Sequence, residues 1–259
     1  MDPAFDDVRF LAGSSNRVDV LGALMSGPMT RDGLLAQVEA SRVTCQRILA
    51  ELKERGWIRY QEPEYAATAV GRTIFREFEQ FLDTVRATRR LDDVMPWLPI
   101  EAFDFSIGRL AEARVTIPND THYAATIRRV DELIRGASES MVLSHGVSSS
   151  TVAATRDAVV EHGQHFEIVL PEYTISYIEA DAPLLETFSE LVEAEGATVY
   201  VTPNSPPEMM VALLDDVAVL GLLGDGLPRG VIESEDGVVC KWARDTFEQW
   251  RADATVLEP

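Results

Sequence analysis

Apolar residues recur with helical spacing through the first part of the chain and then alternate over two short stretches. Spacings of three and four residues predict amphipathic helices, and alternation predicts half-buried strands. Thr30 can cap the second helix, and Gly56 can end the third. The order helix, helix, turn, helix, hairpin is that of a winged helix-turn-helix. The expected elements are helices over residues 16–26, 31–38 and 42–55 and strands over 57–61 and 65–68.

A long stretch of helical spacing follows, residues 69–90. It carries too many large apolar side chains for a helix that touches only a small module. The stripe needs a partner, which is either the second half of the same chain or the same helix of a second subunit. We favour the second subunit, because winged helix-turn-helix modules usually bind DNA as two-fold dimers. Residues 95–99, which include two prolines, break the helix and are expected to form a linker. The stripe consists of Ile74, Phe78, Phe81, Leu82 and Val85.

Beyond residue 100, strand-like and helix-like stretches alternate, which predicts helices covering a largely parallel sheet. Residues 209–214 and 217–222, hinged at two aspartates, predict an antiparallel hairpin, so the sheet is expected to be mixed. The remaining expected elements are strands over 114–117, 141–144, 166–170, 198–201 and 230–234 and helices over 123–134, 151–162, 183–194 and 241–250.

The predicted fold class is therefore α/β plus a winged helix, in three segments. Residues 1–68 form the winged helix-turn-helix DNA-binding domain. Residues 69–99 form a long dimerisation helix and linker. Residues 100–259 form an α/β effector-sensing domain.

The composition of the 259 residues, 46% of them hydrophobic, is that of a globular protein with a sizeable core. No apolar run of about 18 residues occurs, and the first residues lack the pattern of an export signal. We therefore expect a cytoplasmic protein without a membrane segment. Cys45 and Cys240 lie far apart inside hydrophobic patterns, so we expect reduced core thiols rather than a disulfide or a metal site.

The net charge of −20 is distributed unevenly. Residues 1–90 hold 13 acidic and 13 basic side chains, whereas residues 91–259 hold 30 acidic and 10 basic ones. Only two of the basic residues are lysines, and this acid-rich, lysine-poor balance resembles that of proteins from salt-loving archaea. In molar salt the Debye length is about 3 Å, so an acidic surface repels DNA weakly. The acidity can equally be a solvation adaptation unrelated to function.

The third predicted helix has a defined outward side, because its apolar residues fall at i, i+3, i+4 and i+7 from Cys45. We expect Gln46 and Arg47 to read bases and Val43 to contact a thymine methyl group. A lone arginine here is more often a solvated surface group, so the prediction depends on the whole arrangement. Flanking and phosphate-contacting candidates are Arg42, Thr44, Lys53, Arg59 and Gln61.

Residues 41–58, Ser-Arg-Val-Thr-Cys-Gln-Arg-Ile-Leu-Ala-Glu-Leu-Lys-Glu-Arg-Gly-Trp-Ile, resemble the recognition helix and first wing strand of archaeal winged-helix regulators. Residues 68–71, Thr-Ala-Val-Gly, are similar to the start of the long helix in those proteins. Residues 100–255 resemble the sensor domain of haloarchaeal regulators related to TrmB-like and FilR-type proteins. That resemblance implies a fold akin to phospholipase D.

No catalytic residue, metal site or cofactor is expected. Phospholipase D chemistry needs a lysine two positions after a histidine, and His122, His145, His162 and His165 all lack one. Phosphate-loop, serine-hydrolase and zinc-protease motifs are also absent from the sequence.

Polar residues follow several of the predicted strands, where ligands collect in α/β sheets. The candidate ligand-binding residues are Ser144, His145, Ser148, Glu172 and Asn204. They can also be ordinary turn and capping residues. The sequence thus predicts a homodimeric regulator that binds double-stranded operator DNA and senses a small-molecule effector such as a sugar or sugar phosphate. The alternative is a protein-interaction adaptor with a winged-helix fold, which the neutral charge of residues 1–90 favours.

Overall fold

The computed structural model describes residues 2–118, 124–206 and 209–258. The chain divides into two compact units, Met1–Leu82 and Asp83–Pro259, with the boundary inside a long helix. Within the described ranges, no helix is both long and apolar enough to cross a membrane.

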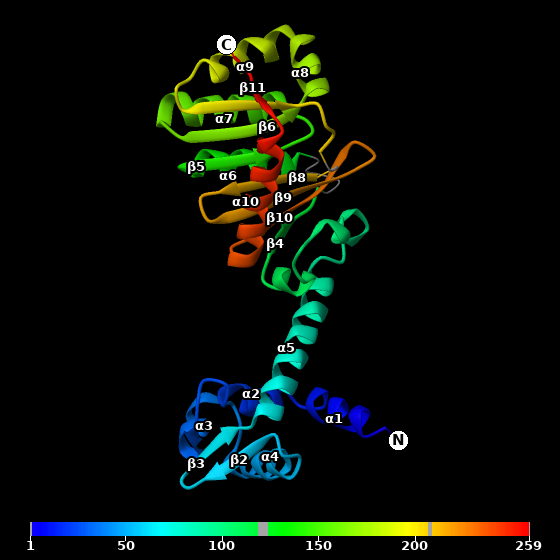
Figure 1. Ribbon diagram of the computed structural model, residues 1–259, viewed down its shortest axis with the longest axis vertical. Coiled ribbons are helices and arrows are strands. Elements are labelled where there is room, and N and C mark those ends of the chain that lie inside the picture. Colours follow the sequence, from blue (N-terminus) through cyan, green and yellow to red (C-terminus); the bar gives the residue numbers. More distant parts are fainter. Residues whose placement is uncertain (1, 119–123, 207–208, 259) are drawn as a thin grey trace. The chain divides into compact units, whose positions relative to one another are not determined.

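The first unit packs helices on a three-stranded antiparallel sheet, in the order β1-β3-β2 (Figure 1). The predicted helices and hairpin are confirmed, and Thr30 and Ser41 cap α3 and α4 with their side chains. Helix α1 and the short strand β1 were not predicted. The elements are α1 (Pro3–Ala12), α2 (Ser15–Ala23), β1 (Met29–Thr30), α3 (Arg31–Gln37), α4 (Arg42–Glu54), β2 (Ile58–Gln61), β3 (Glu64–Ala67) and the start of α5 (Ala69–Arg90).

Helix α1 begins at a side-chain cap that is followed by a proline. The Asp2 carboxylate accepts a hydrogen bond from the Ala4 backbone nitrogen at 2.9 Å, and Pro3 occupies the first helical position. Phe10 and Leu11 bring its second half into the core of the first unit, together with apolar residues of α2, α3 and α4. This core includes Cys45, which is a free, buried thiol as expected.

The second unit is built on an eight-stranded mixed sheet with the order β11-β7-β6-β5-β8-β9-β10-β4. The mixed character and the antiparallel β8–β9 hairpin are confirmed. The expectation of a largely parallel sheet is wrong, because only the β5–β6 and β6–β7 pairs are parallel among the pairs described. The strands are β4 (Arg114–Thr116), β5 (Glu139–Leu143), β6 (His165–Pro171), β7 (Ala197–Thr202), β8 (Met209–Leu214), β9 (Val217–Gly224), β10 (Leu227–Ser234) and β11 (Thr255–Val256).

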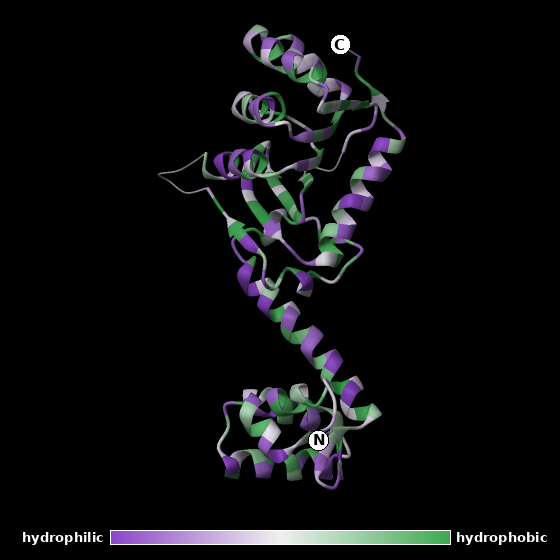
Figure 2. Cartoon of the chain, turned by 90° about the vertical axis from the view of Figure 1, so that its left-hand side faces the viewer, coloured by the Kyte–Doolittle hydropathy of each residue, from purple (hydrophilic) through white to green (hydrophobic). Residues whose placement is uncertain are grey.

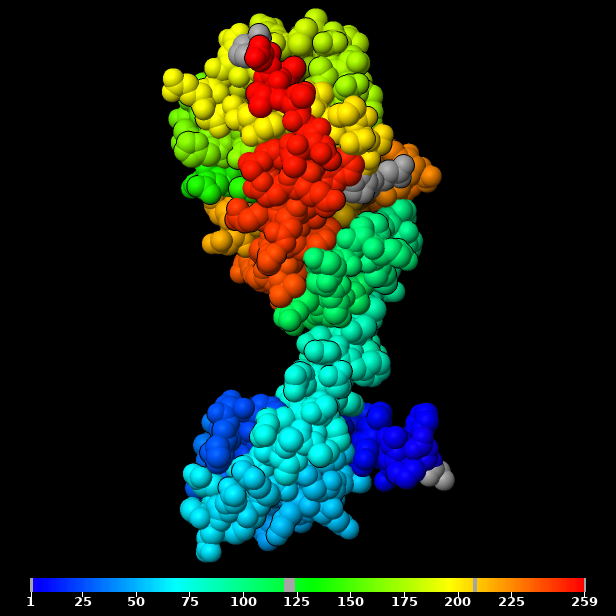
Figure 3. Space-filling model, in the orientation of Figure 1, coloured from blue at the N-terminus to red at the C-terminus, as the bar shows by residue number. Residues whose placement is uncertain are grey.

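Helices cover both faces of this sheet, each over its own apolar core. The core on one face includes residues of α6 (Ala125–Gly136), α7 (Ser149–His162), α8 (Glu172–Glu179) and α9 (Ala182–Val192). Helix α10 (Gly237–Ala252) covers the other face, which is the near face in Figure 3. Figure 2 shows the apolar strands between these layers.

Residues 95–99, expected as a linker, contact the core beneath α10, in which Leu98 is buried and against which Met95 and Trp97 pack. The 3₁₀ helix η1 (Met95–Trp97) lies between Val94 and Leu98, which are both buried. Two further short 3₁₀ helices follow, η2 (Ile100–Ala102) and η3 (Ile107–Leu110). Helix α6 begins at Ala125, and Tyr123, with which we expected it to begin, lies outside the described residues.

Candidate nucleic-acid interface and ligand cavity

Helix α4 has one fully buried side and one exposed side, as its spacing predicts. Cys45, Ile48 and Leu52 have no exposed surface, and Leu49 is almost as deeply buried. The helix begins at a firm cap, because the Thr44 backbone nitrogen donates to the Ser41 hydroxyl oxygen at 3.1 Å. Burial and capping therefore fix the direction in which the outward side chains point.

The outward side of α4 carries the predicted base-reading residues. Val43 is 80% exposed. Gln46 is exposed one turn further on. The Arg47 guanidinium donates to the Glu51 carboxylate at 2.9 Å but leaves the side chain 57% exposed. These three side chains form a continuous patch, which we call the α4 face.

The other predicted DNA-contacting residues surround this patch or lie on the hairpin. Arg42 is exposed, with its guanidinium 3.8 Å from the Asp32 carboxylate, and Lys53 lies two turns after Gln46 on the same flank. Arg59 and Gln61 are exposed on strand β2. Thr44 differs from them, because its hydroxyl lies 2.9 Å from that of Ser41 and belongs to the helix cap.

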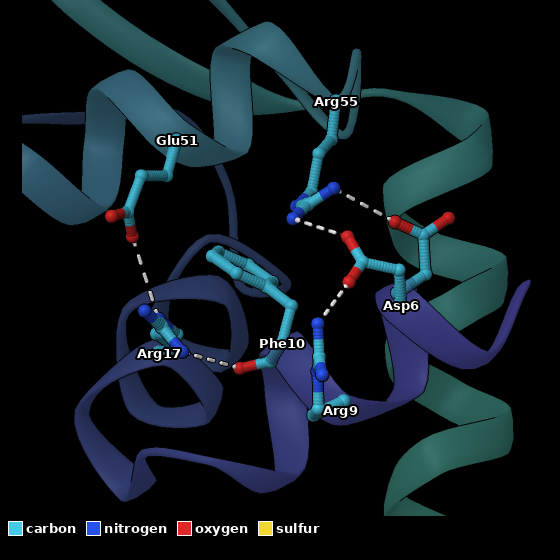
Figure 4. A network of polar contacts seen from close by, with 7 residues as sticks. Asp6, Arg9, Phe10, Arg17, Glu51 and Arg55 are labelled. Carbon is cyan, nitrogen blue, oxygen red and sulfur yellow. Dashed lines mark hydrogen bonds and ion pairs between the residues drawn. The ribbon is translucent and has the colours of Figure 1, made fainter. Parts of the chain in front are cut away.

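A network of arginines and acids fastens α1 to the rest of the first unit (Figure 4). The Phe10 ring lies between Arg17 and Arg55, whose guanidinium carbons are each 4.2 Å from its centroid. Arg17 donates to the Phe10 carbonyl oxygen at 2.8 Å, and Arg55 donates to the Asp7 carboxylate at 3.0 Å. These two arginines therefore have partners within the first unit.

The second unit contains a cavity of about 320 Å³ between its sheet and helices α6, α7 and α9. Its walls are mainly aliphatic and aromatic side chains of the core on that face. The lining includes no aspartate, glutamate, lysine or arginine among the described residues. The polar side chains in the lining are Thr126, Ser144, His145, Ser148, Thr151 and Thr155.

Three of the five predicted ligand-binding residues, Ser144, His145 and Ser148, lie together in this lining. Ser148 is also the cap of α7, since its hydroxyl oxygen accepts from the Thr151 backbone nitrogen at 3.2 Å. Glu172 and Asn204 are exposed outside the lining: Glu172 begins α8, and Asn204 follows β7. Sequence reasoning missed the apolar walls, although the helical spacing of Val130 and Ile134 on α6 marked part of them.

Helix α6, one wall of the cavity, is held in place by polar contacts. The Arg129 guanidinium makes two hydrogen bonds to the buried Glu233 carboxylate of β10, at 2.8 and 2.7 Å. These hydrogen bonds raise the pKa of Arg129 above its ordinary value. The Thr151 hydroxyl of α7 donates to the Asp131 carboxylate of α6 at 2.7 Å. These contacts join α6 to β10 and α7.

Comparison with solved structures gives only distant likenesses. TrmBL2, described as an archaeal chromatin protein with a novel mode of DNA binding, shares 11% identity at a TM-score of 0.41, with 93% of each chain covered. Nuc from Salmonella typhimurium, a phospholipase D family member, shares 14% identity at a TM-score of 0.43 over 57% of this chain and 99% of its own. NucT from Helicobacter pylori shares 12% identity at a TM-score of 0.45, over 56% of this chain and 98% of its own. TM-scores below 0.5 do not establish a shared fold.

Family models give a firmer result. No curated protein matches the sequence. Residues 5–90 match the model described as the HVO_A0261 N-terminal domain, and residues 123–253 match the middle domain of the methanogenesis regulatory protein FilR1. Because the second match alone spans more than half of the 259 residues, the chain belongs to the family defined by the FilR1 middle domain.

Proposed function

We propose that this chain is a DNA-binding transcriptional regulator with an N-terminal winged helix-turn-helix and a phospholipase D-like sensor unit. The α4 face is the observation that carries the proposal. Val43, Gln46 and Arg47 project from a helix whose opposite side is buried and whose start is capped. A helix of this kind fits the major groove of DNA, with the residues near its N-terminus closest to the bases. Membership in a family of regulatory proteins supports this function.

Each group on this surface has a specific role in the proposal. Arg47 gives two parallel hydrogen bonds to guanine, Gln46 gives two to adenine, and Val43 packs on a thymine methyl group. The surrounding groups, Arg42, Lys53, Arg59 and Gln61, bind phosphates and set the position of the helix without reading sequence.

The proposal extends to a homodimer of haloarchaeal type that has no catalytic activity of its own. Phe81 on α5 is 59% exposed, which supports pairing through this helix. The acid-rich, lysine-poor composition supports a high-salt environment, where duplex DNA and an acidic protein repel each other little. None of the four histidines has a lysine two positions later, so the phospholipase D reaction lacks its paired groups.

In vitro selection from random duplexes tests the proposal even though the operator sequence is unknown. The full chain, in high salt, should enrich one sequence, ideally a two-fold one. Arg47→Ala should then weaken binding to that duplex on the order of 5- to 150-fold, the range for losing one bidentate base contact. Arg9→Ala is the matched control, because it removes one charge from a 70% exposed side chain away from the α4 face. Its affinity should stay within about twofold of the wild type.

The protein-interaction adaptor remains the second candidate, because residues 1–90 carry no net charge. That function predicts that selection enriches no duplex sequence. It also predicts that Arg47→Ala and Arg9→Ala behave alike. Either result overturns the regulator proposal.

A further inference from the structure

The cavity of the second unit is a partly open pocket, and many of its lining residues belong to an apolar core. It measures about 320 Å³ and borders the core side chains Val142, Phe166, Ile168 and Phe188. Its size is that of a small-molecule site, and most of its wall is hydrocarbon.

Part of the wall is adjustable. Met210 of β8 and Gly221 of β9 are register partners, and both line the cavity. A Cβ atom at Gly221 would lie 3.2 Å from two carbons of Met210, so the methionine side chain packs closely over the glycine. Methionine side chains are unbranched and flexible, which lets a wall adapt to a bound molecule.

One polar group of a lining residue has no hydrogen-bond partner among the described residues. The Thr126 hydroxyl is buried, with the residue only 2% exposed, and has no hydrogen-bond partner within the described part of the chain. The neighbouring hydroxyls differ, because Thr155 donates to the Thr151 carbonyl oxygen at 2.8 Å and Ser144 donates to the Gly146 carbonyl oxygen at 2.7 Å. Buried polar groups are nearly always paired in folded proteins. The Thr126 residue lines the cavity, but its hydroxyl oxygen has almost no accessible surface, so it can hydrogen-bond a polar atom in the cavity only after its side chain rotates.

We infer that the cavity binds an uncharged, mainly apolar small molecule with one hydroxyl or carbonyl group, which hydrogen-bonds Thr126. This inference rests on the proposed sensor function and replaces the sugar or sugar phosphate expected from the sequence. The described residues of the lining include no lysine or arginine that could pair with a phosphate group. Burying an unpaired charge is strongly unfavourable. A sugar would bring several hydroxyls to a wall whose hydroxyls, apart from that of Thr126, mostly have partners within the protein.

Calorimetric titration of the full chain in high salt tests the class of ligand, with 1-octanol, octanoate and glucose 6-phosphate as probes. Octanol should bind saturably at one site per chain and at least tenfold more tightly than either anion. Equal or tighter binding of glucose 6-phosphate, or no saturable binding of octanol, overturns the inference. Val147→Phe, which enlarges a half-buried residue of the lining, should abolish octanol binding.

A pair of matched variants tests the attachment point. Thr126→Val removes the hydroxyl without a described partner and should weaken octanol binding about two- to tenfold, the range for one hydrogen bond. Thr155→Val makes the same change at another lining residue, on α7, whose hydroxyl is already bonded within that helix, and should leave the affinity within about twofold. Equal losses in the two variants overturn the role of Thr126. If Thr126→Val does not fold, the probe series and Val147→Phe still decide the ligand class.

The outcomes also separate this inference from the proposed function. Enrichment of a duplex sequence without octanol binding leaves the regulator proposal in place and rejects the ligand class. Octanol binding without enrichment of a duplex sequence supports the ligand class and rejects the regulator proposal.

Discussion

Replacing Gly71 with alanine should destabilise the first unit, because α5 approaches the Trp57 backbone at this glycine. A Cβ atom at position 71 would lie 2.0 Å from the Trp57 carbonyl oxygen and 2.8 Å from its carbonyl carbon. Both atoms belong to backbone and cannot rotate away. The same oxygen accepts hydrogen bonds from the Thr68 backbone nitrogen at 2.9 Å and from the Thr68 hydroxyl at 3.1 Å. Relieving the clash therefore means separating α5 from this junction and weakening both bonds.

Two opposing effects decide the size of the loss. Alanine is about 1 kcal/mol better than glycine inside a helix. Overpacking typically costs about 1–3 kcal/mol, and each strained hydrogen bond adds about 0.5–1.5 kcal/mol. The clash outweighs the helix preference, and we expect a net loss of about 2–3 kcal/mol in the free energy of unfolding. That is a large part of the stability of a typical domain.

Hydrogen exchange followed by mass spectrometry measures this loss within the first unit. Protection of amides in α4 and β2 that exchange through unfolding of the unit should fall on the order of 30- to 150-fold, since about 1.4 kcal/mol corresponds to tenfold. Gly33→Ala is the control, because a Cβ atom there meets its nearest atom at 3.4 Å, an ordinary contact. It should leave protection unchanged or raise it. Unchanged protection in Gly71→Ala would refute the reasoning.

Two further predictions concern the second unit. Asp215 has a positive φ of 50°, and its carboxylate accepts hydrogen bonds from the Ser138 and Glu139 backbone nitrogens at 3.0 and 2.9 Å. Asp215→Ala should lower the free energy of unfolding by about 2–3 kcal/mol, and Asp215→Asn by about half as much. Equal losses for the two variants in denaturant titrations would contradict this account. Burial, and then the hydrogen bond to Glu167, raise the pKa of Tyr200, so the folded state favours the neutral phenol. This stabilisation is complete below the ordinary pKa of about 10 and is lost as the pH rises through the raised folded value. Stability should therefore fall more steeply above about pH 10 in the wild type than in Tyr200→Phe, and identical unfolding profiles would contradict the assignment.

Local pattern was sufficient for much of the fold. The buried stripe of α4, the extent of α5 and the β8–β9 hairpin could be predicted, because the spacing of apolar residues defines which side of an element is buried. Helix α1 was missed although Asp2 and Pro3 form a recognisable start signal. Its ten residues carry few core side chains, so the periodic signal was weak.

Other features depended on contacts between distant segments. Residues 95–99 contain two prolines and look like a linker, yet Leu98 among them and Val94 just before them are buried in the core beneath α10. The ligand site was predicted from polar residues after strands, and only the loop after β5 reached the cavity. Its apolar walls resembled ordinary core positions in the sequence, because a side chain beside a void and one in a packed core have the same local pattern.

The sequence by itself determined where the helices and strands run and which side of α4 faces outward, since both depend on residues within a few positions of each other. Only the tertiary structure decided the strand order, the burial of Leu91, Val94 and Leu98, and the uncharged cavity beneath α6 and α7. These features arise when segments far apart in the chain pack together, and the space between them depends on how well their side chains fit.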